Sequence, residues 1–339
     1  HPQRAIGVLQ AAGLHVALFD QVQENPTTRH VEAGLALARQ ERIDGIVAVG
    51  GGSSMDCAKG VNFLLTNGGT MRDYWGVGKA TKPMLPSVGV PTTAGTGSEA
   101  QSFALICDPE THLKMACGDK KAAFQVAILD PELTLTQPER VAALPGIDAL
   151  SHALETYVTV KRTPLSRLYS REAWRLLAGH LQRVLAEPDD LHARAAMQWG
   201  AHLAGLAIEN SMLGATHALA NPLTAHYGMI HGQAIGIMLP HVIRYNAATM
   251  AVDYAELADL AGLSGGSNEA KALALADFVA RAARLVGLPG CLADCGVSDG
   301  MLTVLADEAA EQWTGKFNPR PVGYAELLGL YQSAMTGTG

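Results

Sequence analysis

Two short segments of this 339-residue chain combine residue types that could bind a metal ion. In the first, Asp148 and His152 are four residues apart, so their side chains would share one face of a helix. The second segment contributes His217 and His231. One carboxylate and three imidazoles suit Fe2+ or Zn2+ better than Ca2+ or Mg2+. The residue types predict a transition-metal site, although Pro222 prevents the spacing alone from placing His217 and His231 on one helix face.

The remaining histidines have a simpler interpretation. An isolated helical histidine is more often a surface or core residue than a metal ligand. We interpret four of them in this way: His30, His180, His192 and His202.

The composition limits the classes of protein to consider. With 339 residues and 48% hydrophobic residues, the chain is long enough for two domains. A net charge of -7 without a basic run argues against a nucleic-acid partner. No membrane span or signal peptide is indicated, and we expect a cytoplasmic enzyme with a small-molecule substrate. Five scattered cysteines favour buried thiols over a disulfide framework.

Short apolar segments alternate with helical segments in residues 1–145, which predicts an α/β domain with a parallel sheet, because parallel strands need crossover connections. In residues 146–339, apolar residues recur at helical spacing, which predicts an all-helical domain. The expected strands are residues 14–19, 45–49, 85–90 and 126–129, and the expected helices are 31–40, 54–65, 165–185, 191–209, 268–286 and 301–314.

Two glycine-bearing loops follow predicted strands. The first, Gly50 to Asp56, opens a helix, where backbone N–H groups can approach a pyrophosphate. It lacks the G-x-G-x-x-G pattern, so a phosphate site and a plain tight turn both remain open. The second loop, residues 91–99, is expected at the same carboxyl edge of the sheet, where ligands bind in open α/β sheets. This second loop favours nucleotide binding.

These loops and both ligand segments, together with Asn25-Pro-Thr27, Asp130-Pro-Glu-Leu133 and Asn318-Pro-Arg320, occur in the order found in the iron-containing, or group III, alcohol dehydrogenases. The chain strongly resembles this family. The resemblance implies a Rossmann-like dinucleotide-binding domain and an all-α domain, in a dehydroquinate synthase-like architecture with the active site between them. It also implies a homo-oligomer, a dimer or larger.

The resemblance further implies ligand sets. Asp148, His152, His217 and His231 would hold Fe2+, with Zn2+ as an alternative. NAD or NADP would be bound by Gly51, Gly52, Ser53, Asp56, Thr92, Thr93 and Lys114. The implied reaction interconverts alcohols with aldehydes or ketones by hydride transfer, with the metal as Lewis acid on the substrate oxygen.

Two alternatives stay open at this point. A dehydroquinate synthase-like lyase would also use NAD and a metal, but its anionic substrates call for several cationic side chains, and only Lys161 and Arg162 lie near the ligands in the sequence. A non-catalytic nucleotide-binding protein would have no need of the four ligands.

The chain departs from the family pattern at two places. Many relatives carry a proton-relaying histidine where this chain has Asn221, which does not titrate near neutral pH. We hypothesise that the proton leaves through water or cofactor hydroxyls, helped by His226. The chain also opens within what looks like the helix after the family's first strand, so roughly 40 residues are expected to be missing, and NAD cannot be distinguished from NADP.

Overall fold

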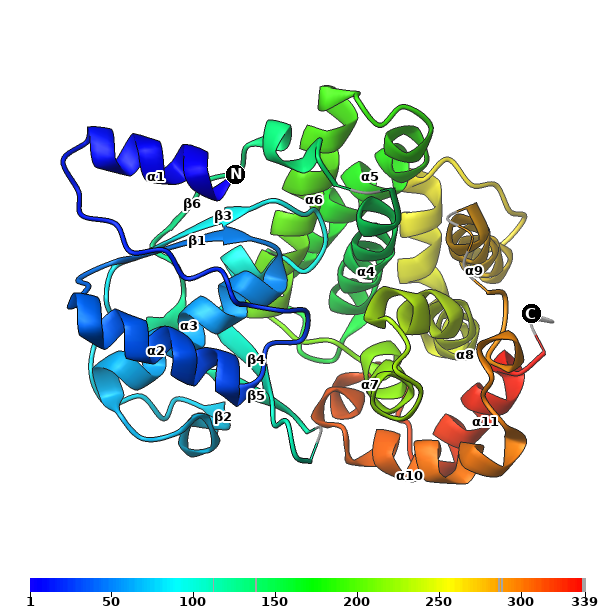
Figure 1. The fold of residues 1–339 in the computed structure, drawn as a ribbon. Coiled ribbons are helices and arrows are strands. Elements are labelled where there is room, and N and C mark those ends of the chain that lie inside the picture. Colours follow the sequence, from blue (N-terminus) through cyan, green and yellow to red (C-terminus); the bar gives the residue numbers. More distant parts are fainter. Residues whose placement is uncertain (112, 138, 286, 288, 337–339) are drawn as a thin grey trace. The chain divides into compact units, whose positions relative to one another are not determined.

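The computed structural model describes residues 1–339 except 112, 138, 286, 288 and 337–339, and divides into two compact units, His1–Thr136 and Gln137–Gly339 (Figure 1). The boundary that we placed after residue 145 falls inside the helix α4 (Glu139–Val158). Pro145 lies within this helix and does not end it. The predicted boundary therefore lies nine residues beyond the division between the units.

The first unit contains the parallel sheet that the sequence predicts. Strands β1 (Ile46–Gly50), β3 (Ser87–Pro91) and β6 (Val126–Ala127) pair in the order β1-β3-β6, and both ladders are parallel. The helices α2 (Thr28–Glu41) and α3 (Gly52–Asn67) correspond to the predicted helices on either side of β1. Parallel pairing brings the carboxyl ends of β1 and β3 to one edge, with Gly50 opposite Pro91.

A second sheet was not predicted from the sequence. Strands β2 (Gly76–Val77), β5 (Lys114–Gly118) and β4 (Phe103–Cys107) pair in the order β2-β5-β4. The β4–β5 pair is antiparallel, and alternate residues of both strands are buried. The alternation that identifies half-buried strands is therefore present in this part of the sequence.

The strand predicted at residues 14–19 is wrong. These residues follow α1 (Pro2–Ala11) and belong to no ladder among the described residues. Phe19 packs against the core of the first unit, whereas Leu14 and Leu18 are exposed. An apolar run alone does not establish a strand, since a strand also needs a partner for its backbone groups.

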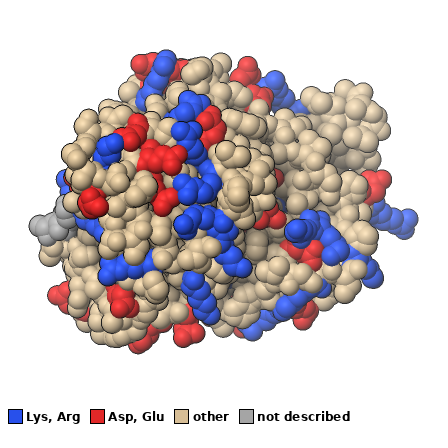
Figure 2. All heavy atoms as spheres, turned by 180° about the vertical axis from the view of Figure 1, so that it is seen from behind, with Lys and Arg blue, Asp and Glu red and all other residues tan. Residues whose placement is uncertain are grey.

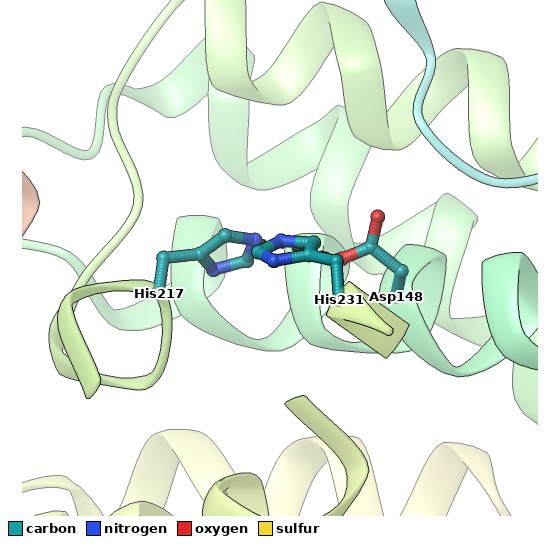
Figure 3. A group of neighbouring side chains, drawn as sticks. All are labelled: Asp148, His217 and His231. Carbon is teal, nitrogen blue, oxygen red and sulfur yellow. Dashed lines mark ion pairs between the residues drawn. The ribbon is translucent and has the colours of Figure 1, made fainter. Parts of the chain in front are cut away.

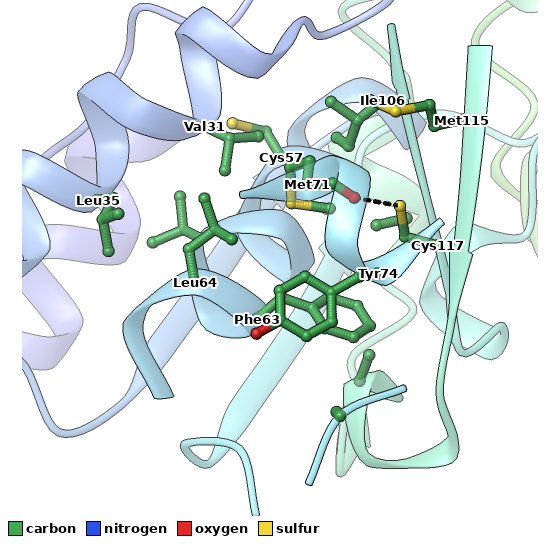
Figure 4. Close-up of a cluster of buried hydrophobic side chains, with 14 of the residues drawn as sticks. Val31, Leu35, Cys57, Phe63, Leu64, Met71, Tyr74, Ile106, Met115 and Cys117 are labelled. Carbon is green, nitrogen blue, oxygen red and sulfur yellow. Dashed lines mark hydrogen bonds between the residues drawn. The ribbon is translucent and has the colours of Figure 1, made fainter. Parts of the chain in front are cut away.

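The core of the first unit lies between α2, α3 and the second sheet (Figure 4). Val31 of α2 contacts α3 at Gly60, where a Cβ atom would lie 2.9 Å from the Val31 side chain. The absence of a side chain at Gly60 lets the two helices approach closely. Ile106 and Met115 cover this core from the strands β4 and β5.

The regular elements of the second unit are all helices, and its described residues form no strand, as the sequence predicts. Helix α9 ends at Leu285, so residue 286 of the predicted helix 268–286 lies outside the described residues. No helix in the described part is both long and apolar enough to cross a membrane. The helices after α4 are α5 (Pro164–Ala186), α6 (Leu191–Glu209), α7 (Ala215–Tyr227), α8 (His231–Leu260), α9 (Asn268–Leu285), α10 (Leu302–Glu311) and α11 (Tyr324–Ala334).

Charged side chains of both signs lie near one another on the face shown in Figure 2. Within the second unit, Arg167 of α5 illustrates such pairing, because its Nη1 lies 2.8 Å from Asp253 Oδ1 of α8. Partly exposed pairs of this kind contribute little stability individually. The apolar faces of the helices therefore determine which helices pack together.

Candidate metal centre and nucleotide-binding loops

Helix α4 positions two of the four predicted ligands. Asp148 and His152 are both buried and lie one turn apart on this helix. Their spacing places the Nε2 atom of His152 3.3 Å from the Oδ1 atom of Asp148. The expectation that the pair shares one helix face is met in the structure.

The other two ligands come from the starts of two further helices. His217 lies in the first turn of α7, and His231 is the first residue of α8. Their Nε2 atoms lie 3.5 Å and 3.7 Å from the same Asp148 oxygen, and Figure 3 shows the three side chains pointing toward one another. The structure therefore brings Asp148, His217 and His231 together as a group that could hold a metal ion, and His152 lies 3.3 Å from the Asp148 carboxylate without belonging to that group.

A turn and a close helix contact produce this arrangement. Gly228 ends α7 in the left-handed conformation, with φ of +59°, which favours glycine. Gly232, next to His231, packs so closely on α4 that a Cβ atom would lie 2.4 Å from the carbonyl oxygen of Leu144. Pro222 lies inside α7 and does not separate the two histidines from the site.

The site fits a divalent transition metal. Asp148 Oδ1 and His217 Nε2 are buried atoms that accept or donate no hydrogen bond among the described residues. Buried polar atoms normally have partners, so such atoms need an explanation. Ligand atoms about 2.0–2.2 Å from one ion stand roughly 3–3.5 Å apart, and the three imidazole Nε2 atoms lie 3.3–3.7 Å from Asp148 Oδ1. A metal ion would supply the partner that these atoms lack.

The charges of the site favour a cation. Burial alone would raise the pKa of Asp148, but the imidazoles of His152, His217 and His231 hold it well below its usual range. Burial alone would lower the pKa of His217, but the Glu155 and Asp148 carboxylates raise it to about 9. The carboxylates are ionised, and in the absence of a metal they favour a proton on His217.

In the first unit, the two glycine-bearing loops lie side by side. Gly51 is the N-cap of α3, and glycine has no side chain that could accept hydrogen bonds from the first backbone N–H groups of the helix. A Cβ atom at Gly51 would lie 3.3 Å from the side chain of Thr93, and the Thr92 N–H donates to the Gly50 carbonyl at 2.9 Å. The predicted residues Gly51, Gly52, Ser53, Thr92 and Thr93 are thus neighbours at the carboxyl edge of the parallel sheet.

A buried lysine connects the two loops and was missed in the sequence. Lys59 of α3 donates from Nζ to the Ser98 carbonyl at 2.7 Å and to the Phe103 carbonyl at 2.8 Å. Asp56 accepts from the Ser98 hydroxyl at 2.6 Å. Burial raises the pKa of Asp56, while Lys59 and Lys114 act in the opposite direction. The available signal was that Lys59 and Asp56 are charged residues in a helix that is mostly buried.

The predicted catalytic residues Asn221 and His226 are both on α7. Asn221 lies one turn beyond His217, and its Nδ2 donates to Gln312 Oε1 at 2.9 Å. His226 lies in the last turn, with its Nε2 2.8 Å from Glu308 Oε1. Nine residues of helix correspond to about 13 Å along the axis, so His226 would need intervening groups to relay a proton from the metal centre.

Glu155 is a second residue of the site to which the sequence analysis gave no role. It is buried on α4, and its Oε2 lies 2.6 Å from His217 Nδ1. The only signal in the sequence was its position three residues after His152.

An α/β unit with two neighbouring glycine loops and a helical unit with a group of side chains that could hold a metal ion together indicate a nucleotide-linked metalloenzyme. The family model described as iron-containing alcohol dehydrogenase matches residues 2–131, and its C-terminal counterpart matches residues 142–335. The chain belongs to the iron-containing alcohol dehydrogenase family.

Named relatives agree with this assignment. The chain is 35% identical to the NAD-dependent methanol dehydrogenase of Bacillus methanolicus, over 96% of this chain and 86% of that protein. It is also 35% identical to the 1,3-propanediol dehydrogenase of Klebsiella pneumoniae, over 98% and 86%. A crystal structure of 1,3-propanediol oxidoreductase superposes with a TM-score of 0.95, 35% identity, and coverage of 98% of this chain and 88% of that one.

These findings decide between the readings left open by the sequence. The chain is an NAD(P)-linked, metal-dependent oxidoreductase that interconverts alcohols with aldehydes or ketones, and its cofactors are the nicotinamide nucleotide and iron expected for the family. The dehydroquinate synthase-like lyase and the non-catalytic nucleotide-binding protein do not fit this family membership.

Proposed function

We propose that Asp148, His152, His217 and His231 hold the metal of this dehydrogenase, which is Fe2+ or Zn2+. The observation that carries the proposal is the placement of three imidazole Nε2 atoms 3.3, 3.5 and 3.7 Å from Asp148 Oδ1. When bound, the metal supplies a Lewis acid for the oxygen of the alcohol or carbonyl substrate.

The four side chains have complementary tasks. Asp148 provides the negative charge that offsets a dication, and its ionised form is favoured by the surrounding imidazoles. The histidines provide neutral nitrogen donors from three different helices, α4, α7 and α8. Asp148, His152 and His217 are all at least 94% buried, whereas the His231 side chain is 26% exposed, so the site is open on the side of His231.

The second part of the proposal concerns the nicotinamide nucleotide. Gly51, Gly52 and Ser53 at the start of α3 are proposed to bind its pyrophosphate through backbone N–H groups, helped by the helix dipole. Thr92 and Thr93 contribute from the neighbouring loop. Asp56 and Lys114 are proposed to lie at the cofactor as well, with Lys59 holding the two loops together.

For the substrate, we propose small primary alcohols and the corresponding aldehydes. Support comes from the names of relatives at 34–35% identity, which act on methanol, 1,3-propanediol or lactaldehyde. Asn221 and Gln312, linked one turn beyond His217, offer neutral hydrogen-bonding groups that suit an uncharged polar substrate.

The experiment combines metal analysis with turnover. Wild-type protein, Asp148→Asn and His217→Ala would be compared for bound iron or zinc and for oxidation of NADH or NADPH with propanal. His202→Ala is the control, since His202 lies on α6 and stacks on Trp199. We expect metal and turnover to be lost together in the two ligand variants and kept in the control. Full turnover in a metal-free ligand variant would contradict the proposal.

We also propose a cytoplasmic location and an oligomeric state, each on its own grounds. All five cysteines are present as thiols, which suits the reducing conditions of the cytoplasm. We also propose a homo-oligomer, a dimer or larger, and light scattering on the purified protein would measure its mass. A monomeric mass at working concentration would contradict this assembly.

A further inference from the structure

Glu155 connects the metal centre to the start of α7. Its Oε2 accepts a hydrogen bond from His217 Nδ1 at 2.6 Å, and its Oε1 accepts one from the Thr216 N–H at 2.7 Å. The carboxylate is buried, and burial of a charge is costly unless hydrogen bonds satisfy it. Two consecutive residues of α7 provide those hydrogen bonds.

The N-cap of α7 explains why a carboxylate from another helix is needed. The cap residue is Gly214, which has no side chain to accept the first N–H groups of the helix. A Cβ atom at Gly214 would lie 3.1 Å from Glu155 Oε1. Gly214 therefore makes room for Glu155, which caps the helix in place of a local serine, threonine or aspartate.

The same contact determines which nitrogen of His217 is available. A carboxylate only accepts hydrogen bonds, so the proton of the neutral imidazole is held on Nδ1. The lone pair is then on Nε2, which lies 3.5 Å from Asp148 Oδ1. The opposite tautomer would leave no electron pair directed at the metal centre.

The geometry points to Glu155 as a positioning residue that fixes the tautomer and the orientation of His217 for metal binding. This inference rests on the proposed metal site. In known metalloproteins, carboxylates that accept from a ligating histidine typically contribute a factor of about 10–100 to metal affinity. Glu155 contributes in this way while also anchoring the helix that carries His217.

Asn318 offers a matched control because it anchors the same helix start without contacting the imidazole. Its Oδ1 accepts from the Ala215 N–H at 3.4 Å and from Asn246 Nδ2 at 3.0 Å. A Cβ atom at Gly214 would lie 3.2 Å from this oxygen, about as close as to Glu155. Asn318→Ala therefore loosens the helix start and leaves the hydrogen bond to His217 Nδ1 in place.

The test compares Glu155→Gln, Asn318→Ala and the wild-type protein. Glutamine has the shape of glutamate but only one acceptor oxygen, so either the Thr216 N–H or the Nδ1–H of His217 must face an amide NH2 group. Zn2+ affinity would be measured by competition with a chromophoric chelator, and thermal unfolding would be measured for all three proteins without metal. We expect Zn2+ affinity to fall about 10–100-fold in Glu155→Gln and less than about threefold in Asn318→Ala.

A spectroscopic measurement on the wild-type protein needs no variant. In zinc-loaded protein with 15N-labelled histidine, the inference predicts that His217 is protonated at Nδ1 and metal-bound at Nε2. A His217 bound through Nδ1 would overturn it, as would equal Zn2+ affinities of Glu155→Gln and wild type, or equal losses in both variants. If the wild-type protein bound no metal, the proposed function itself would fail. If the wild-type protein bound metal and Glu155→Gln bound it equally well, only the role of Glu155 would fail.

Discussion

Gly232 is predicted to be the glycine on which the metal centre depends most. A Cβ atom at this position would lie 2.4 Å from the carbonyl oxygen and 2.8 Å from the carbonyl carbon of Leu144 in α4. Both are backbone atoms, so no side-chain rotation can relieve the contact in Gly232→Ala. The first turn of α8 would have to move away from α4, and His231 would move with it.

The magnitude follows from comparison with Gly179 in α5, where no described heavy atom lies within 4 Å of an added Cβ. Gly179→Ala should gain about 0.5–1 kcal/mol from helix propensity. Gly232→Ala should lose about 1–3 kcal/mol through overpacking. The two glycine-to-alanine changes are therefore expected to differ by about 1.5–4 kcal/mol and to have opposite signs.

Urea unfolding of the metal-free proteins would measure this difference, and Zn2+ titration would measure the effect on the centre. We expect Gly232→Ala to bind Zn2+ at least about tenfold more weakly, because the Nε2 of His231 is already 3.7 Å from Asp148 Oδ1. A Gly232→Ala protein as stable as wild type and with unchanged metal affinity would refute the reasoning.

Three further predictions concern other positions. Burial, with a contribution from Arg244, lowers the pKa of His241 to about 4, so the unfolded state binds its proton more readily and stability falls as pH drops from 6.5 toward 4. Urea unfolding would measure how far the free energy of unfolding falls between pH 7 and pH 5. This fall should be about 2 kcal/mol smaller in His241→Gln than in wild type, and equal falls would contradict the prediction. Lys59→Met should destabilise the protein by about 2–4 kcal/mol, because three buried oxygens lose their donor, and an unchanged urea midpoint would count against that role. Asp148→Asn should weaken Fe2+ or Zn2+ binding at least about 100-fold, as calorimetry would show, since the only ligand charge is removed, and near-normal affinity would argue for a different site.

Local patterns predicted most elements of the fold. The helix at residues 191–209 has the predicted bounds, and β1 and β3 pair in parallel as the alternation of strands and helices indicates. The prediction for residues 14–19 failed because the segment has no pairing strand among the described residues, and only Phe19 of its apolar residues packs on the core. The strands β4 and β5 were overlooked although alternate residues are buried in each.

The site was predictable in its residue types and not in its geometry. Asp148 and His152 could be placed together because one helix fixes their spacing. The convergence of His217 and His231 depends on the turn at Gly228 and on the close packing of Gly232, and neither has a periodic signal. Glu155 could not be assigned a partner because its hydrogen bonds reach a helix some sixty residues away in the sequence.

The central claim is that turnover requires a metal held by the four ligands. The most direct measurement follows NADH or NADPH absorbance with propanal, before and after the protein is stripped with a chelator and then given Fe2+ or Zn2+. We expect stripping to abolish turnover, one equivalent of metal per chain to restore it, and Asp148→Asn to stay inactive after metal is added. Undiminished turnover in the metal-free wild-type protein would show that the reaction does not need this metal.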